Sequence, residues 1–254
     1  MTDFQKVESY YKAFNEWNRT FTAEGTLEFE IILELIKKYT RVGDKVLDLG
    51  GGPGRYTIEL AKTGRHMSLG DISPELIAIA KEKTSGLNHI EAINVVNAMD
   101  LGIYKDNAFD AVVYMGPLYH LTEEQEIDTA LKEVRRILKP NGTIIAGFIP
   151  RLSGTAGIIE RSIYAPAQVT PKNLQNTYKS GIFENHSNSG FQEGMYLSST
   201  QIERMMQDSG FEKITMRSVR GLGYKLEKGI LAKKEEDPEL FKTIMQVIEE
   251  SAEN

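Results

Sequence analysis

A cluster of glycines next to an acid is the feature of this sequence that points most directly to chemistry. The stretch KVLDLGGGPGRY runs from Lys45 to Tyr56 and places an apolar run, Asp48 and four glycines in succession. Glycine has no Cβ atom, so the main chain can approach a ligand closely. A glycine cluster can also be a plain tight turn, but this one follows a strand of the buried type and opens a helix. The pattern therefore predicts a ligand-binding turn after the first strand.

The spacing of these glycines does not match two common phosphate-binding motifs. A dinucleotide fingerprint counted from Gly50 and Gly52 puts Arg55 at the third glycine position, where close packing of helix on strand needs a small residue. A P-loop ends in Lys followed by Ser or Thr, and GRYT has neither in place. Arg55 therefore argues against a nucleotide-dependent oxidoreductase. The spacing that remains is Asp48-x-Gly50-x-Gly52-x-Gly54.

Polar residues also follow the later strands. Asp71, in SLGDIS, stands about twenty residues beyond the first glycine, where an acid can accept hydrogen bonds from both hydroxyls of a ribose. Asn97, in VNAMDL, has an amide oxygen that can accept from an exocyclic amine. His120, in GPLYHL, has the ordinary pKa of a general base near neutrality, or else it caps or packs the start of the next helix.

Alternating strands and helices position these residues. Apolar runs typical of buried strands cover residues 45–49, 66–70, 90–96, 109–115 and 143–149. Helices are predicted over residues 56–62, 73–83 and 123–138. Ser73 is expected to cap the second helix, and Thr122 with Gln125 to form a capping box on the third. This order predicts an α/β fold, a doubly wound and mostly parallel Rossmann-like sheet with helices on both faces.

The segments on either side of this core are less regular. Apolar residues recur at helical spacing over residues 7–21 and 27–39, before the first strand. Residues 150–197 are rich in Gly, Ser, Asn and Pro, with only short helical possibilities such as residues 171–179. We expect them to form an insertion after strand five, over the ligand edge of the sheet.

The carboxyl-terminal part is expected to add helices and one strand. A capped helix ends at Gly210, and EKITMRSV, residues 212–219, has the pattern of a sixth strand. The acidic tail from Glu235 is predicted to be helical.

Composition excludes several classes of function. The chain of 254 residues has a net charge of -6 and a pI of about 5.4, so we expect no nucleic-acid partner. Cysteine is absent, and the four histidines show no ligand spacing, so we expect no disulfide and no metal site. The N-terminus has no signal-peptide pattern, and no stretch is apolar enough to span a bilayer. A soluble, cytoplasmic protein with no membrane partner is expected.

These motifs together resemble those of the class I S-adenosylmethionine-dependent methyltransferases. The similarity runs in coherent order over roughly residues 42–210, through SLGDIS, VNAMDL, YMGPLYHL and ILKPNGTIIA, with Asn97 in place of the family's usual Asp. The resemblance implies S-adenosylmethionine as cofactor. It implies that the following residues bind it: Asp48, Gly50, Gly51, Gly52, Gly54, Arg55, Asp71, Ile72, Asn97, Ala98, Met99, Met115, Gly116 and Tyr11.

The acceptor side is expected after strand four, with Tyr119 and His120 as its catalytic residues. Methyl transfer from a sulfonium is an in-line displacement, so the protein mainly aligns the reactants, excludes water and, where needed, takes a proton. Gly116 replaces the leading Asn or Asp of the amino methyltransferases that act on bases or glutamine, which argues against that group. We expect a small-molecule acceptor that is methylated at N, O or C. The alternative is a protein that binds the cofactor without catalysis.

The resemblance also suggests how the chain is organised. The N-terminal helices of this family often fold over the cofactor as a lid, which would bring Tyr10, Tyr11 and Arg19 to it, although an aromatic stripe is also typical of plain core. We divide a single domain, residues 1–254, into lid, cofactor core, substrate-capping insertion, and C-terminal helices with a strand: residues 1–40, 41–150, 151–197 and 198–254.

The end of the sheet and the assembly state are separate questions. Related chains usually add a last antiparallel strand between strands five and six. We expect this chain to lack that strand, to be helical around residues 225–233, and to leave an open sheet edge. The sequence leaves monomer and homodimer both open.

Overall fold

Two compact units make up the part of the chain that the structure describes. This structure is a computed structural model that describes residues 2, 16–19, 21–185 and 193–253. Among the described residues, one unit comprises residues 2, 40–185 and 193–212, and the other residues 16–19, 21–39 and 213–253. Residues 16–19 and 21–39 of the predicted lid therefore group with the carboxyl-terminal segment.

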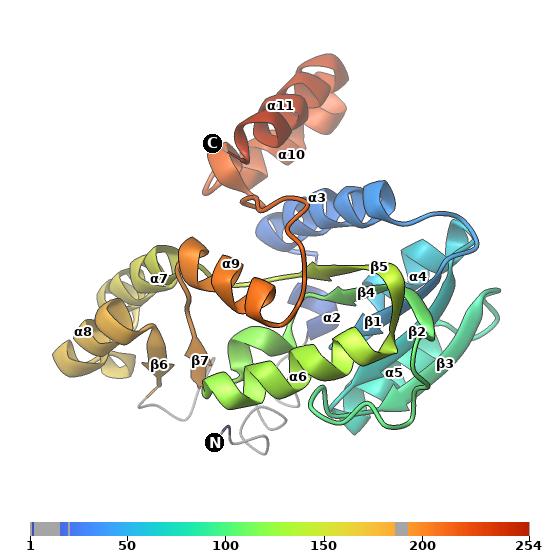
Figure 1. Cartoon of the computed structure of the whole chain (residues 1–254). Helices are drawn as coiled ribbons and strands as arrows, with labels where there is room; N and C mark the ends of the chain where they lie inside the picture. The colour runs from blue at the N-terminus through green and yellow to red at the C-terminus, as the bar shows by residue number, and fades with distance from the viewer. Residues whose placement is uncertain (1, 3–15, 20, 186–192, 254) are drawn as a thin grey trace. The chain divides into compact units, whose positions relative to one another are not determined.

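A five-stranded parallel sheet forms the centre of the first unit (Figure 1). Its strands are β1 Lys45–Leu49, β2 His66–Asp71, β3 Ile90–Val95, β4 Phe109–Tyr114 and β5 Leu138–Ala146. Their order is β3-β2-β1-β4-β5, and every neighbouring pair is parallel. Val46, Leu47, Val112 and Val113 are fully buried because the two central strands are covered on both faces. The strand order reverses between β1 and β4, which is where α/β sheets of this kind bind ligands.

Helices cover both faces of this sheet, as predicted. They are α4 Arg55–Lys62, α5 Pro74–Lys83 and α6 Glu124–Ile137. The chain steps from β1 to β2 to β3 in one direction through α4 and α5, and from β4 to β5 in the other through α6. Right-handed crossovers therefore place α6 on the opposite face from α4 and α5. The predicted doubly wound α/β fold is confirmed.

Of the two caps predicted for helices that cover the sheet, one forms. The Ser73 hydroxyl accepts a hydrogen bond from the Leu76 amide at 3.3 Å, as expected. The prediction of a capping box of Thr122 and Gln125 was wrong. The helix α6 begins one residue later than predicted, and its N-cap residue, Glu123, makes no side-chain cap bond. The Thr122 amide instead donates to the hydroxyl of Thr2 at 3.0 Å.

The insertion after β5 is more regular than its composition suggested. It contains α7 Arg151–Tyr164, η2 Pro166–Gln168, α8 Pro171–Ser180, and a small antiparallel pair, β6 Ile182–Glu184 and β7 Glu193–Met195. The sequence predicted α8 but missed α7, whose glycines are poor helix formers. Tertiary packing explains the difference. A Cβ on Gly154 would lie 2.1 Å from the Tyr196 ring, so only glycine allows this close contact, and Ile158 joins Phe183 and Tyr196 in a buried cluster.

One more helix of this unit follows the insertion. It is α9 Ser199–Asp208, and its capping box of Ser198 and Gln201 agrees with the predicted capped helix. The helix is followed by Gly210 in the left-handed region, with a φ of 80°.

The regular elements described in the second unit are all helices. These are α2 Glu16–Arg19, α3 Ala23–Tyr39, η3 Gly221–Gly223, α10 Glu227–Glu236 and α11 Pro238–Ser251. Leu27, Ile230 and Ile248 form its buried cluster. The helix expected around residues 225–233 is confirmed as α10.

The predicted sixth strand was wrong. Residues 212–219 form no strand, and the described sheet ends at β5. The backbone of this segment bonds to the end of α11 instead: the Ser218 amide donates to the Ala252 carbonyl at 3.0 Å. The Arg217 guanidinium lies 3.5 Å from the Glu249 carboxylate in the same unit. A segment whose alternating apolar residues suit a strand thus lies against the end of a helix.

Candidate functional site

The glycine turn between β1 and α4 is set by backbone geometry that favours glycine. Gly50, Gly52 and Gly54 have φ values of 74°, 53° and 87°, in the left-handed region. The Gly50 amide donates to the Gly70 carbonyl of β2 at 2.7 Å. A Cβ on Gly50 would lie 2.3 Å from the Pro117 ring, after β4. A side chain at position 50 would therefore clash with the protein's own Pro117, whether or not a ligand lies there.

Asp48 supports this turn from inside the sheet. Its carboxylate is 2% exposed and accepts from both the amide and the hydroxyl of Thr57, at 3.2 and 2.7 Å. It thereby caps α4, whose N-cap residue Gly54 offers no side chain. A Cβ on Gly51 would lie 2.7 Å from the Asp48 carboxyl carbon. Thr57 gave no signal in the sequence, because only the fold brings it to Asp48.

Burial changes the acidity of Asp48. It raises the pKa of the carboxyl to about 6, against the lowering effect of the Thr57 bonds. The negative charge of Asp71 nearby raises this pKa further. Two carboxyl groups therefore make the interior of the turn electronegative.

Asp71 ties the turn to the next strand and helix. Its two oxygens accept from the Gly52 amide and from the Ser73 amide, each at 2.9 Å, and the residue is 8% exposed. A carboxylate oxygen can accept more than one hydrogen bond, so an oxygen that accepts from a backbone amide can also accept from a ribose hydroxyl. The Asp71 carbonyl accepts from the Val96 amide at 2.9 Å, which links β2 to the segment after β3.

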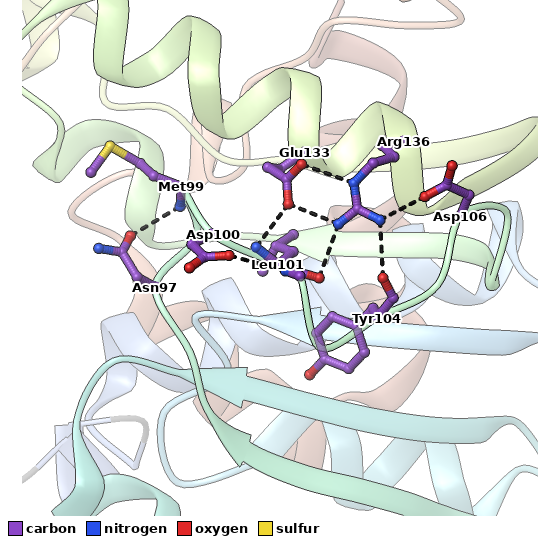
Figure 2. A network of polar contacts seen from close by, with 9 residues as sticks. Asn97, Met99, Asp100, Leu101, Tyr104, Asp106, Glu133 and Arg136 are labelled. Atoms are coloured by element: carbon purple, nitrogen blue, oxygen red, sulfur yellow. Dashed lines mark hydrogen bonds and ion pairs between the residues drawn. The ribbon is translucent and has the colours of Figure 1, made fainter.

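The segment after β3 folds into a turn of its own. The Asn97 amide oxygen accepts from the Met99 backbone amide at 2.9 Å (Figure 2). The Asn97 carbonyl accepts from the Asp100 backbone amide, also at 2.9 Å. Ala98 between them is buried. The side chain that the resemblance assigns to a ligand thus also shapes the local backbone.

Two residues of α6 hold the rest of this loop (Figure 2). The Glu133 carboxylate accepts from the Leu101 amide at 2.8 Å, while the Arg136 guanidinium donates to the carbonyls of Leu101 and Tyr104, both at 3.0 Å. Arg136 also pairs with Asp106 at 2.8 Å. The hydrogen bond from Arg136 is the main cause that lowers the pKa of Glu133. An acid and a base three residues apart on a helix usually form a solvated surface pair, so the sequence did not reveal this role.

The chain after β4 turns into the short helix η1, Pro117–His120. The rings of Tyr119 and His120 lie 4.9 Å apart. His120 is 6% exposed, and burial lowers its pKa to about 4, so its imidazole is neutral at pH 7. Gly116 has room for a methyl group, because the nearest atom to a Cβ there is the Gly50 carbonyl oxygen at 3.6 Å.

The structure gathers most of the predicted site residues at one edge of the sheet. Arg55 begins α4, and half-buried Ile72 and Met115 directly follow β2 and β4. Tyr10 and Tyr11 lie outside the described residues, as does the side chain of Arg19. Within the described ranges, no three His, Asp or Glu side chains are grouped as ligands for a metal ion.

Comparison with known proteins shows that the part of the chain that forms this edge is similar to a known family. Residues 46–142 match the family described as a methyltransferase domain. The chain is 33% identical over 120 residues to the ubiquinone/menaquinone biosynthesis C-methyltransferase UbiE of Rickettsia akari, covering 44% of this chain and 47% of that one. It is 28% identical over 201 residues to UbiE of Klebsiella pneumoniae, covering 76% and 73%. The chain thus spans about half the length of the first of these relatives.

A solved structure agrees on the fold. A methyltransferase of Methanosarcina mazei superposes with a TM-score of 0.59 at 23% identity, over 72% of this chain and 87% of that one. The resemblance to class I S-adenosylmethionine-dependent methyltransferases is confirmed, with residues 46–142 as the part that matches the family.

The raised pKa of Asp48 predicts a pH-dependent stability difference. The folded-state pKa exceeds the unfolded value, so its contribution to stability is full below pH 4 and is lost as the pH rises through 6. Asp48→Asn keeps an oxygen for Thr57 and removes the titration. The free energy of unfolding of the variant, relative to wild type, should therefore rise by about 2 kcal/mol between pH 4.5 and 7.5 in urea titrations. Asp208→Asn, whose side chain is 74% exposed, should show a flat difference. A flat difference for Asp48→Asn as well would contradict the prediction.

The α6 contacts predict an effect on cofactor affinity from residues outside the turn. Arg136→Met keeps the stem of the side chain but removes the donors to two loop carbonyls, bonds worth about 1.5–3 kcal/mol each when charged. Water compensates part of that loss at this half-exposed position, so affinity for S-adenosylhomocysteine should fall roughly tenfold by calorimetry. Arg135→Met is the matched control, since Arg135 donates to the Gly210 carbonyl instead. Equal affinities in the two variants would show that the loop does not depend on Arg136.

Proposed function

We propose that this chain is an S-adenosylmethionine-dependent methyltransferase that acts on a small-molecule acceptor. The observation that carries the proposal is the convergence of four chain segments, after β1, β2, β3 and β4, at the point where the strand order reverses. The quinone methyltransferases to which the chain is similar act on small molecules, which supports an acceptor of that size. The net charge of -6 supports the absence of a nucleic-acid substrate.

The residues present fit the cofactor chemically. Asp71 supplies a buried carboxylate suited to ribose hydroxyls, and Asn97, Ala98 and Met99 supply the polar turn suited to an adenine edge. The two carboxyl groups at the turn, Asp48 and Asp71, complement a cationic ligand. When bound, S-adenosylmethionine supplies the activated methyl group.

Catalysis in this proposal rests mainly on positioning. Neutral, buried His120 is a weak base, because the pKa of about 4 leaves little driving force to remove a proton at neutral pH. The residues of η1 therefore hold the acceptor in line and exclude water, and the acceptor reacts without a strong base. Tyr119 is the residue of η1 proposed to line the acceptor side.

Replacing Asp71 tests the cofactor assignment. Asp71→Asn loses a charged acceptor and one of the two backbone bonds, so affinity for S-adenosylhomocysteine should fall by about 1–3 kcal/mol, or roughly five- to 150-fold. Asp208→Asn is the control, since that carboxylate lies on α9 and its side chain is 74% exposed. Titrations of the wild type with S-adenosylmethionine, S-adenosylhomocysteine and NAD complete the test. Failure of wild type to bind either sulfur compound would refute the proposed function, and binding without methyl transfer to any acceptor in a panel would favour a non-catalytic protein.

Replacing His120 tests the mechanism. If positioning dominates, His120→Ala should lower turnover by about tenfold to a hundredfold with cofactor affinity nearly unchanged. The wild-type rate should then show no histidine titration between pH 5.5 and 8.5, since the imidazole is already neutral there. A loss of roughly a thousandfold or more, with a rate that rises through a histidine-like pKa, would instead identify His120 as the base.

A further inference from the structure

The outer face of α7 carries an exposed apolar stripe. Leu152, Ile159 and Ile163 are 72%, 48% and 66% exposed, and the spacing of these three residues, with Ala156 between them, places all four on one side of the helix. A solvent-facing helix side is ordinarily polar, so a contiguous apolar stripe marks a contact surface.

The stripe continues onto α8, which packs beside α7 (Figure 1). An open, mainly apolar groove runs between the two helices, lined among others by Ile159, Leu174 and Tyr178, with Lys172 at its side. Tyr178, in the lining of this groove, is 57% exposed. Tyrosines in such places suit a boundary between apolar and aqueous surroundings, because the ring is apolar and the hydroxyl is not.

The charge of this helical pair is opposite to that of the chain as a whole. Residues 151–180 contain four basic residues and one acidic residue, a net charge of +3 in a chain of net charge -6. Lys172 and Lys179 are exposed on α8, and neither has a carboxylate within ion-pair distance among the residues that the structure describes. An anionic surface therefore attracts this face and repels the remainder of the molecule.

We propose that the α7–α8 face, defined by Leu152, Ile159, Ile163, Tyr178 and the two lysines of α8, docks on an anionic lipid surface. The apolar stripe would lie in the boundary between headgroups and acyl chains, and the lysines would reach the lipid phosphates. Such a contact lies on the membrane and does not cross it. No helix among the described residues is long and apolar enough to cross one.

Charge decides between a lipid surface and a second copy of the chain. Self-association through this face would bring the exposed Lys172 and Lys179 side chains of two copies together, which is unfavourable. Anionic lipid satisfies both the apolar stripe and the lysines.

The same face is connected to the acceptor side of the site. α8 packs against β6, β6 pairs with β7, and β7 lies beside η1, all within one compact unit. Docking would thus bring the enzyme's acceptor side near lipophilic small molecules. That consequence rests on the proposed function, whereas the docking itself does not.

Co-sedimentation of the full chain with vesicles tests the proposal. Wild type should bind vesicles of phosphatidylcholine mixed with phosphatidylglycerol and bind pure phosphatidylcholine much more weakly. Lys172→Gln with Lys179→Gln should lower binding to the mixed vesicles on the order of tenfold or more, since each lysine near an anionic surface contributes about fivefold. Leu152→Ser with Ile163→Ser should lower binding to both kinds of vesicle by roughly tenfold or more.

A matched control and a second measurement keep the result interpretable. Val42→Ser with Ile103→Ser removes side chains that are 75% and 61% exposed elsewhere in the same unit, and should leave vesicle binding unchanged. Each variant should keep the wild-type affinity for S-adenosylhomocysteine, which separates this proposal from the proposed function. The proposal would be overturned if the wild-type protein did not bind the mixed vesicles. It would also be overturned if sedimentation velocity showed a wild-type dimer, the Leu152→Ser with Ile163→Ser variant were a monomer, and neither protein bound lipid.

Discussion

The bond network of Asp71 is the constraint on which the cleft depends. One carboxylate holds the amide of Gly52 in the turn after β1 and the amide of Ser73 at the start of α5. Both amides would otherwise be donors without intrahelical or strand partners, which is costly in a buried position. A single side chain at the end of β2 therefore fixes the turn after β1 relative to the start of α5, beside the point where the strand order reverses.

This arrangement has an electrostatic cost that a cationic ligand would relieve. Asp48 lies beneath the same turn, and burial together with the charge of Asp71 raises its pKa to about 6. Desolvation of a second carboxyl is unfavourable unless its charge is compensated. Thr57 compensates part of it through two hydrogen bonds. The remainder makes the turn electronegative, which suits a positively charged sulfonium better than the phosphates that glycine turns of other families bind.

The two halves of the first unit differ in the side chains that they expose. In the core, the polar contacts of α6 run to backbone groups of a loop: Glu133 and Arg136 bond the backbone at Leu101 and Tyr104 rather than simply facing solvent. In the insertion, Arg151 likewise bonds the carbonyls of Tyr196 and Lys179, but Leu152, Ile159 and Ile163 of α7 face outward. A rigid ligand edge and an outward-facing apolar surface are thus built from consecutive parts of one chain.

The sequence by itself determined those features that depend on neighbouring residues. The apolar runs of β1 and β4, the helical spacing of α4 to α6, the Ser73 cap and the left-handed glycines of the turn all follow from local pattern and backbone freedom, and all are found. The order of acids and glycines along the chain was enough to indicate the family, because parallel strands deliver their carboxyl ends to one edge.

Tertiary structure decided what depends on residues far apart. Pro117 excludes a side chain at position 50, Thr57 satisfies Asp48, and Arg136 holds a loop some 30 residues away; none of these partners is adjacent in sequence. The same cause explains the errors. The strand pattern of residues 212–219 met a helix end instead of a sheet edge, and α7 formed in spite of its glycines because Gly154 lets Tyr196 pack against it. Local periodicity states which face of a segment is apolar, but only the assembled fold states what that face meets.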